Sequence, residues 1–312
     1  MYYKISNLLI VVFLSLHSLN YGQTTYHSLD DVVSKPLFNE NTLLQHIKTL
    51  SSDAFEGRRT GTRGALKAKR YIINEFQTLN VLPFYKDYEQ SFSFFEGGTN
   101  YHGVNVLGCI KGTKEPNKFI VISAHYDHEG IKKGQIYNGA DDNASGVSAL
   151  FSFAEYFEKN PPKHSVVLAA FDGEELGLHG SKYFVNHPVV SIKSIMVNLN
   201  MDMISRSDKK ELFVVGTQYN KNLKQLILDF KQSGKEKLIV GHDGEDGLED
   251  WTFSSDQGSF RENGIPFLYF GVEDHEDYHM PTDDFEKIQT DFYIESVKNI
   301  ITVFKQIDKL NF

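Results

Sequence analysis

The feature that most constrains this chain is a set of four continuous apolar runs, each bounded by turn residues. The runs lie at 119–124, 165–171, 195–199 and 265–270. Continuous apolar runs, unlike alternating ones, are typical of strands that are buried on both faces. Amphipathic helical patterns lie before, between and after the runs, at 42–50, 63–79, 145–158, 180–186, 220–231 and 284–309. This order predicts a single-domain, three-layer α/β/α fold with a mixed, mostly parallel central sheet.

Composition excludes several other classes of protein. The 312 residues include 40% hydrophobic and 23% charged residues, which is ordinary for a globular chain and unlike a disordered, collagen-like or coiled-coil one. Acidic residues outnumber basic ones by 41 to 32, and the net charge of −9 argues against nucleic acid as a partner. Cys109 is the only cysteine, so an internal disulfide and a thiolate metal site are both excluded.

The first 22 residues have the layout of a secretory signal peptide. Lys4 precedes a short apolar run at 8–16, and a polar stretch follows it. The run is far shorter than the ~20 residues of a membrane-spanning helix, and no later segment comes close. An N-terminal core strand is the alternative interpretation. We predict a signal peptide at 1–22, a domain at 23–312 without a membrane span, and export to the periplasm or the extracellular space.

Polar residues follow each of the four apolar runs. The segments concerned are His125-Tyr126-Asp127-His128, Asp172-Gly173-Glu174-Glu175, Asn200-Met201-Asp202 and Tyr278-His279-Met280-Pro281. Ligands of open α/β sheets bind beyond the carboxyl ends of the strands, so we expect these groups to share one crevice. A fifth polar element, 138–146, begins the helix that follows the first run.

The residue types in these segments suit metal chemistry. Two histidines and three carboxylates without cysteine favour Zn²⁺, with Mn²⁺ or Co²⁺ as possible substitutes. Five ligands exceed the need of one tetrahedral ion, but they suit two ions about 3.5–4 Å apart that share a carboxylate. The pair Glu174-Glu175 could supply one ligand and one proton-transferring carboxylate. Asp127 could accept the second ring N–H of His125.

These motifs resemble those of the M28 metallopeptidases, a family of secreted di-zinc aminopeptidases and carboxypeptidase-like enzymes. The resemblance extends from Leu50 to the C-terminus and includes a weaker match at 255–260. The matching motifs are Ser123-Ala124-His125-Tyr126-Asp127-His128, Asn138-Gly139-Ala140-Asp141-Asp142-Asn143-Ala144-Ser145-Gly146, Phe171-Asp172-Gly173-Glu174-Glu175-Leu176-Gly177, Asn200-Met201-Asp202-Met203 and Asp277-Tyr278-His279-Met280-Pro281-Thr282-Asp283.

The resemblance implies a zinc-dependent exopeptidase fold and a role for each motif residue. It implies that His125, Asp141 and Asp202 bind one ion, and that Asp141 bridges to a second ion, which Glu175 and His279 also bind. Glu174 would be the general base, and Asp127 would support His125. The resemblance also implies a cis peptide bond between Asp141 and Asp142. Two positions depart from the family pattern: Gln257 replaces a histidine of the substrate pocket, and Met280 replaces a common threonine.

Other polar residues have simpler interpretations. Asp142 is predicted to be a charge near a helix N-terminus, and Arg58, Arg59 and Arg63 to be a surface feature. His128 and His275 lie closer to the motifs but are left out of the ligand set. The acidic loop 245–250 is either solvated or attracts a substrate amine, and Trp251 either belongs to the core or lines a specificity pocket. The remaining lone histidines are predicted to lie on the surface or to cap helices: His102, His164, His187 and His242.

The predicted function is that of a secreted zinc aminopeptidase with two Zn²⁺ ions per chain. It would hydrolyse peptides with a free N-terminus through a metal-bridged hydroxide, with Glu174 as general base. One alternative is a glutaminyl cyclase, an acyltransferase on the same scaffold that uses one zinc ion. Another is a non-catalytic binding ectodomain. The oligomeric state, the side-chain specificity and the choice between amino- and carboxypeptidase action are left open.

Overall fold

The computed structural model describes residues 35–84, 87–231 and 236–310, so the predicted signal peptide lies outside the described residues. Residues from Pro36 onward form one compact unit. None of the helices in the described ranges is long and apolar enough to cross a membrane. The α-helices are α1 (Glu40–Leu50), α2 (Arg63–Thr78), α3 (Gly146–Lys159), α4 (His179–Asn186), α5 (Lys221–Leu228), α6 (Gln257–Glu262) and α7 (Thr290–Ile307).

One large mixed sheet runs through the molecule. Its strands are β1 (Leu82–Pro83), β2 (Glu89–Glu96), β3 (Thr99–Ile110), β4 (Glu115–His125), β7 (His164–Phe171), β8 (Ile195–Met201), β9 (Glu211–Val215), β10 (Lys237–Val240) and β11 (Phe267–Gly271). The order is β1-β3-β7-β4-β8-β11-β9-β10, and β2 pairs with β3. The four central strands β7, β4, β8 and β11 are mutually parallel. They correspond to the four apolar runs, so the predicted sheet is confirmed.

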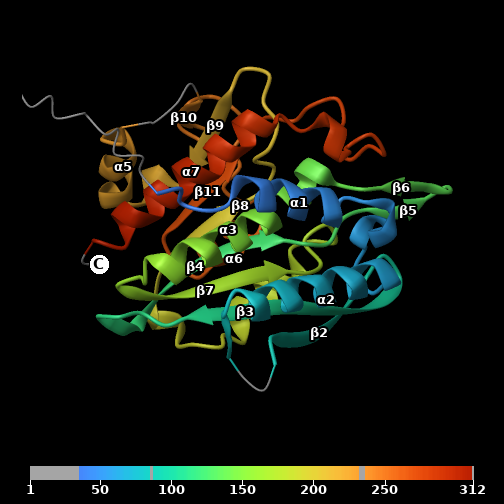
Figure 1. The fold of residues 1–312 in the computed structure, drawn as a ribbon, viewed down its shortest axis with the longest axis horizontal. Coiled ribbons are helices and arrows are strands. Elements are labelled where there is room, and N and C mark those ends of the chain that lie inside the picture. The colour runs from blue at the N-terminus through green and yellow to red at the C-terminus, as the bar shows by residue number, and fades with distance from the viewer. Residues whose placement is uncertain (1–34, 85–86, 232–235, 311–312) are drawn as a thin grey trace, which may run out of the picture. The chain divides into compact units, whose positions relative to one another are not determined.

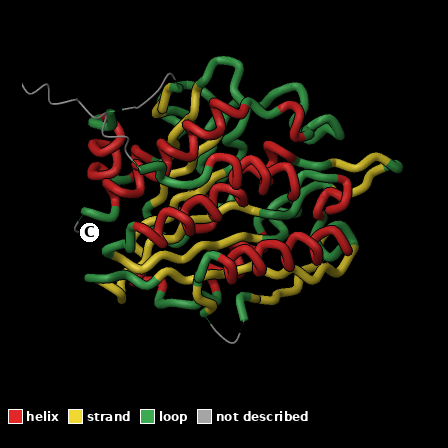
Figure 2. Tube along the Cα trace, in the orientation of Figure 1, coloured by secondary structure: helices red, strands yellow, loops and turns green. Residues whose placement is uncertain are grey.

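Helices cover both faces of the sheet because successive strand residues point to opposite sides. In β4, Ile120 and Ile122 pack in the cluster that contains the apolar faces of α1, α2, α3 and α7. Val121 packs in a second cluster with Phe184 of α4 and Phe260 of α6. Figures 1 and 2 show α1, α2 and α3 lying across one face of the strands. The three-layer architecture predicted from the sequence is therefore present.

The structure also contains elements that the patterns do not reveal. Strands β3 and β10, helix α6 and the small hairpin of β5 (Gly130–Lys132) and β6 (Gln135–Tyr137) have no apolar run of four residues or long helical period, and the run of β9, 212–215, is only four residues long. The closing helix begins at Thr290 and not at 284. The predicted first turn forms a separate short 3-10 helix, Phe285–Lys287, and the extended backbone of Ile288 and Gln289 divides it from α7.

Arg58 is buried in the described unit, which corrects the prediction of a surface feature. Only 1% of it is exposed, and its guanidinium donates to four backbone carbonyls. The acceptors are the carbonyl oxygens of Leu50, Tyr126, Asn138 and Gly139. Burial lowers the pKa of Arg58 to about 10, and the nearby carboxylates, with Asp142 and Asp283 first among them, oppose that shift. Arg58 thus ties α1 to the segments that follow β4 and precede α3.

Replacing Arg58 by methionine is expected to destabilise the metal-free protein by about 3 kcal/mol or more, because four buried carbonyls lose their donor. Urea unfolding followed by circular dichroism measures the change. Arg63→Met is the matched control: its side chain is 75% exposed and pairs with Glu56 at the surface, so its loss is expected to cost less than about 1 kcal/mol. Equal stability of the two variants would contradict this role of Arg58.

Candidate metal centre

The parallel strands bring four predicted segments to one edge of the sheet. His125 is the last residue of β4, Glu175 follows β7, and Asp202 follows β8. His279 lies in the loop after β11. The helical turn that precedes α3, Ala140–Ser145, supplies the fifth element. Because the carboxyl ends of parallel strands meet at the same edge, these residues converge although up to 154 positions separate them in sequence.

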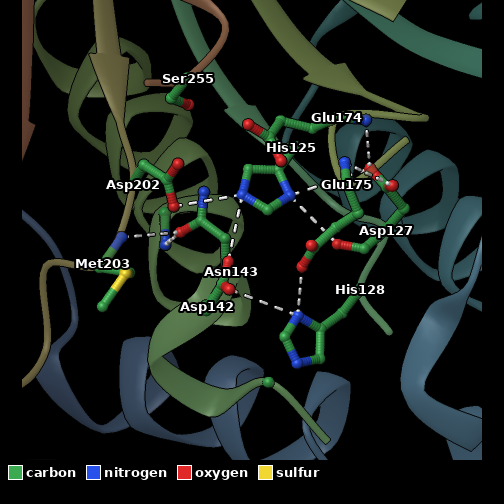
Figure 3. Close-up of polar contacts among 12 residues, drawn as sticks. His125, Asp127, His128, Asp142, Asn143, Glu174, Glu175, Asp202, Met203 and Ser255 are labelled. Atoms are coloured by element: carbon green, nitrogen blue, oxygen red, sulfur yellow. Dashed lines mark hydrogen bonds and ion pairs between the residues drawn. The ribbon is translucent and has the colours of Figure 1, made fainter. Parts of the chain in front are cut away.

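The first group of side chains surrounds His125. Its Nε2 lies 3.3 Å from Oδ1 of Asp142 and 3.1 Å from Oδ1 of Asp202 (Figure 3). All three residues are buried. They form a set of one imidazole and two carboxylates that could hold a metal ion.

The second group surrounds Glu175 and uses the other oxygen of Asp142. Nε2 of His279 lies 3.1 Å from Oδ2 of Asp142 and 3.2 Å from Oε2 of Glu175. Glu129 is also close, with Oε1 3.8 Å from Nδ1 of His279. Asp142 therefore faces both groups, one with each carboxylate oxygen.

Asp141 does not lie in either group, and this corrects the predicted ligand set. Its Oδ1 accepts hydrogen bonds of 2.7 Å from both the backbone N–H and the hydroxyl of Ser205. Its Oδ2 lies 3.0 Å from Nε2 of His275. Likewise the cis peptide bond joins Asp142 to Asn143 and not Asp141 to Asp142. The predicted position is one residue too early, since neighbouring side chains leave the turn in different directions.

Asp127 supports the site in a different way from the one predicted. Nδ1 of His125 lies 3.1 Å from the backbone carbonyl oxygen of Asp127 and 3.8 Å from its carboxylate. The carboxylate instead accepts the backbone N–H groups of Glu174 and Glu175, at 3.1 and 3.3 Å, and the hydroxyl of Thr60. Asp127 therefore orients the turn that carries the two glutamates.

Glu174 lines a cavity beside the two groups but belongs to neither of them. Burial raises the pKa of Glu174 well above its usual value, while His125 opposes the shift and the charges of Asp202 and Glu175 add to it. A carboxyl group in this position, beside both groups but outside them, can accept and return a proton.

The clustered carboxylates of the two groups favour positive charge at the site. Burial opposes charge on His279, but hydrogen bonds to Asp142 and Glu175 outweigh it and raise the pKa of His279 to about 11. Burial likewise opposes charge on His125, whereas the charges of Asp202 and Glu174 raise its pKa well above the usual value. A divalent cation supplies such charge, and imidazole with carboxylate is a ligand set that Zn²⁺ accepts. The residues present therefore fit a metal ion in each group.

A cavity of about 150 Å³ opens beside these groups. Trp251, Tyr269 and Tyr278 form its aromatic walls, and Glu249 and Asp274 add carboxylates away from the histidine groups. Trp251 is only 8% exposed and also packs with Phe213, Phe267 and Tyr269. Trp251 thus belongs to the core and also lines the cavity, and the acidic loop reaches the cavity through Glu249.

Two other predictions need correction. His164 and His242 are buried, at 0% and 2% exposure, and not on the surface. His242 stacks on Trp251 with ring centroids 3.5 Å apart. Gln257 is also buried, and its amide bridges the backbone carbonyl of Trp251 and the side chain of Asn200. It therefore links two elements of the fold and does not line the cavity.

Fold and site together define a class: an α/β protein with a candidate two-metal centre at the carboxyl edge of its sheet. The model of Peptidase family M28 matches residues 105–304. The chain belongs to this family. The chain is therefore a member of a peptidase family.

Named relatives agree with this assignment. The chain is 32% identical over 202 residues to Aminopeptidase YwaD of Bacillus subtilis, which covers 61% of this chain and 41% of that protein. It is 32% identical over 107 residues to a probable zinc metalloprotease of Leptosphaeria maculans, covering 33% of this chain and 25% of the relative. The chain thus spans less than half the length of these two relatives.

Solved structures share the fold at low sequence identity. A glutaminyl cyclase of Porphyromonas gingivalis superimposes with a TM-score of 0.70 at 16% identity, over 87% of this chain and 99% of that one. The zinc aminopeptidase BSAP of Bacillus subtilis superimposes with a TM-score of 0.67 at 17% identity, over 88% and 97% of the two chains. Both are zinc-exopeptidase-type folds, so the predicted fold class is confirmed.

Proposed function

We propose that this protein is a zinc aminopeptidase that binds two Zn²⁺ ions and removes residues from the N-terminus of peptides. The observation that supports this proposal most is the position of Asp142, whose two oxygens face two separate histidine groups. The first ion would be held by His125, Asp142 and Asp202. The second would be held by Asp142, Glu175 and His279. When bound, such ions lower the pKa of a shared water and polarise the substrate carbonyl.

In this mechanism Glu174 transfers the protons. It lies on the cavity wall outside both ligand sets, so its carboxylate is available to accept a proton from the attacking water. Glu174 then returns that proton to the leaving amine when the peptide bond breaks. Asp127 holds the backbone of Glu174 and Glu175 and thereby sets the distance between base and ligand.

The charge of the cavity favours aminopeptidase over carboxypeptidase action. Six carboxylates line it, those of Asp142, Glu174, Glu175, Asp202, Glu249 and Asp274, and no lysine or arginine of the described chain does. Two divalent ions would balance four of these negative charges. The remaining negative charge attracts the ammonium group of a substrate N-terminus and repels a C-terminal carboxylate. A carboxypeptidase would need a cationic residue to bind that carboxylate.

A glutaminyl cyclase is the second candidate, because a cyclase superimposes on this chain with a TM-score of 0.70. The metal content separates the candidates, since the cyclase alternative uses one zinc ion. The presence of both histidine groups favours the peptidase. A non-catalytic ectodomain is less consistent with two intact groups beside Glu174.

To test this, the Zn²⁺-loaded full chain is incubated with unblocked and N-acetylated dipeptides and with aminoacyl amides, including glutamine amide. The release of free amino acids is measured. The variant Glu174→Gln, purified in the same way, is the control for activity from a contaminating peptidase. We expect acetylation to lower the rate by roughly 10–100-fold, because the cavity loses a charged partner. Cyclised glutamine product without hydrolysis would instead establish the cyclase, and preference for blocked substrates would contradict N-terminal action.

Export remains a prediction from residues 1–22, which lie outside the described residues. Expression of the full chain in a bacterial host with a periplasm, followed by mass determination of the mature protein, tests it. Cleavage near Gly22 would support export.

A further inference from the structure

His128 lies against the second group, although the motifs do not mark it as functional. The side chain is completely buried and follows β4 in the same segment as His125. Its Nδ1 lies 2.7 Å from Oε1 of Glu175 and 3.5 Å from Oδ2 of Asp142 (Figure 3). Its Nε2 is buried and has no hydrogen-bond partner among the described residues. A carboxylate only accepts hydrogen bonds, so the ring proton is on Nδ1 and Nδ1 donates to Glu175.

His128, Asp142 and Glu175 by themselves also form a set that could hold a metal ion, but the distances favour a different role for His128. The Nε2 atoms of His125 and His279 lie 3.1–3.3 Å from the carboxylate oxygens of their groups. Ligand atoms about 2.0–2.1 Å from one tetrahedral zinc ion are separated by about 3.3 Å, which agrees with these values. The 2.7 Å contact of His128 is too short for that arrangement and has the length of a charge-assisted hydrogen bond.

We propose that His128 is a positioning residue for the second ion. Its N–H holds Oε1 of Glu175, so that Oε2 is the oxygen presented beside His279 and Asp142. Hydrogen bonds of this kind orient metal-binding carboxylates and increase metal affinity. The segment after β4 would then serve both ions, the first through His125 and the second through His128. This inference rests on the proposed two-ion function.

The test compares Zn²⁺ binding to metal-free protein by titration calorimetry. His128→Phe keeps a ring but removes the donor, and we expect the Kd of the second ion to rise about 10–100-fold while that of the first stays within threefold. His128→Asn places an amide N–H near the position of Nδ1 and is expected to recover most of the affinity.

The matched control is His164→Phe. His164 is also completely buried, its Nδ1 lies 2.9 Å from Oδ1 of Asp308, and its Nε2 has no hydrogen-bond partner in the part of the chain that the structure describes. It lies at the start of β7, so its replacement reproduces the loss of a buried histidine away from the site. We expect this variant to bind both ions like the wild type.

Three results would overturn the proposal. His128→Phe could bind both ions with wild-type affinity, or it could lose both ions equally, which would indicate a general effect on the fold. Alternatively, His279→Ala could retain the second ion and lose it only when His128 is also replaced, which would make His128 a ligand. Failure of the proposed function is distinguishable, because the wild type itself would then bind fewer than two ions or cleave no peptide.

Discussion

Replacing Glu174 by glutamine is expected to abolish nearly all peptide hydrolysis while both metal ions stay bound. The amide cannot accept the proton of the attacking water, and proton transfer by a positioned side chain contributes about 10²–10⁴-fold to the rate. The ligands of both groups remain in place, since Glu174 belongs to neither. Elemental analysis for zinc and kcat on an unblocked dipeptide measure the two quantities on the same sample.

Glu276→Gln is a suitable control for this experiment. Glu276 is a surface carboxylate, 76% exposed and paired with Arg206 at 3.5 Å, and it does not line the cavity. We expect this variant to keep its kcat and its metal. If Glu174→Gln retains wild-type turnover, the base is another residue. If it loses metal, Glu174 is a ligand.

Replacing Asp142 by alanine is expected to remove both activity and metal, because its two oxygens face both groups. Loss of a shared ligand weakens two ions at once, so we expect fewer than two zinc ions per chain and at least about a 10³-fold loss of kcat/KM. Zinc content after dialysis against a weak chelator, measured by elemental analysis, provides the first readout. Hydrolysis of an unblocked dipeptide provides the second.

Replacing the neighbouring residue, Asp141, is the matched comparison for Asp142→Ala. In Asp141→Asn the side-chain oxygen can still accept from the N–H and hydroxyl of Ser205. We therefore expect two bound ions and a change in unfolding free energy of about 1–2 kcal/mol. If Asp141→Asn lost metal and Asp142→Ala kept its normal metal content, the bridging ligand would be Asp141, as predicted from the motif.

Much of the fold could be predicted because its signals are local. An apolar run as long as that of β4 or β7 indicates a strand buried on two faces, whatever its partners are. The ends of α2 and α3 lie within one residue of the predicted positions, since the periodic patterns there are long. Strands such as β9 and β10 were missed because their residues contain no such run, and their place in the sheet depends on their neighbours.

The sequence predicted most of the residues of the candidate site, but not all of them. The four residues that converge lie at the end of a strand or in the segment after it, and the parallel order of the strands brings them together: His125, Glu175, Asp202 and His279. The motif could not show which neighbour in the Asp141-Asp142 pair faces the groups. That choice depends on how the turn is held, and Asp283, 142 residues later, accepts the backbone N–H of Asp141.

The sequence by itself therefore determined the sheet, its helical layers and the segments that meet at its edge. These properties follow from hydrophobic periodicity and from the types of residue at strand ends, which act over a few neighbouring positions. Only the tertiary structure decided the orientation of Asp142, the burial of Arg58 and the contact of His128 with Glu175. Each of these depends on hydrogen bonds between segments that are distant in the chain, and no local pattern carries that information.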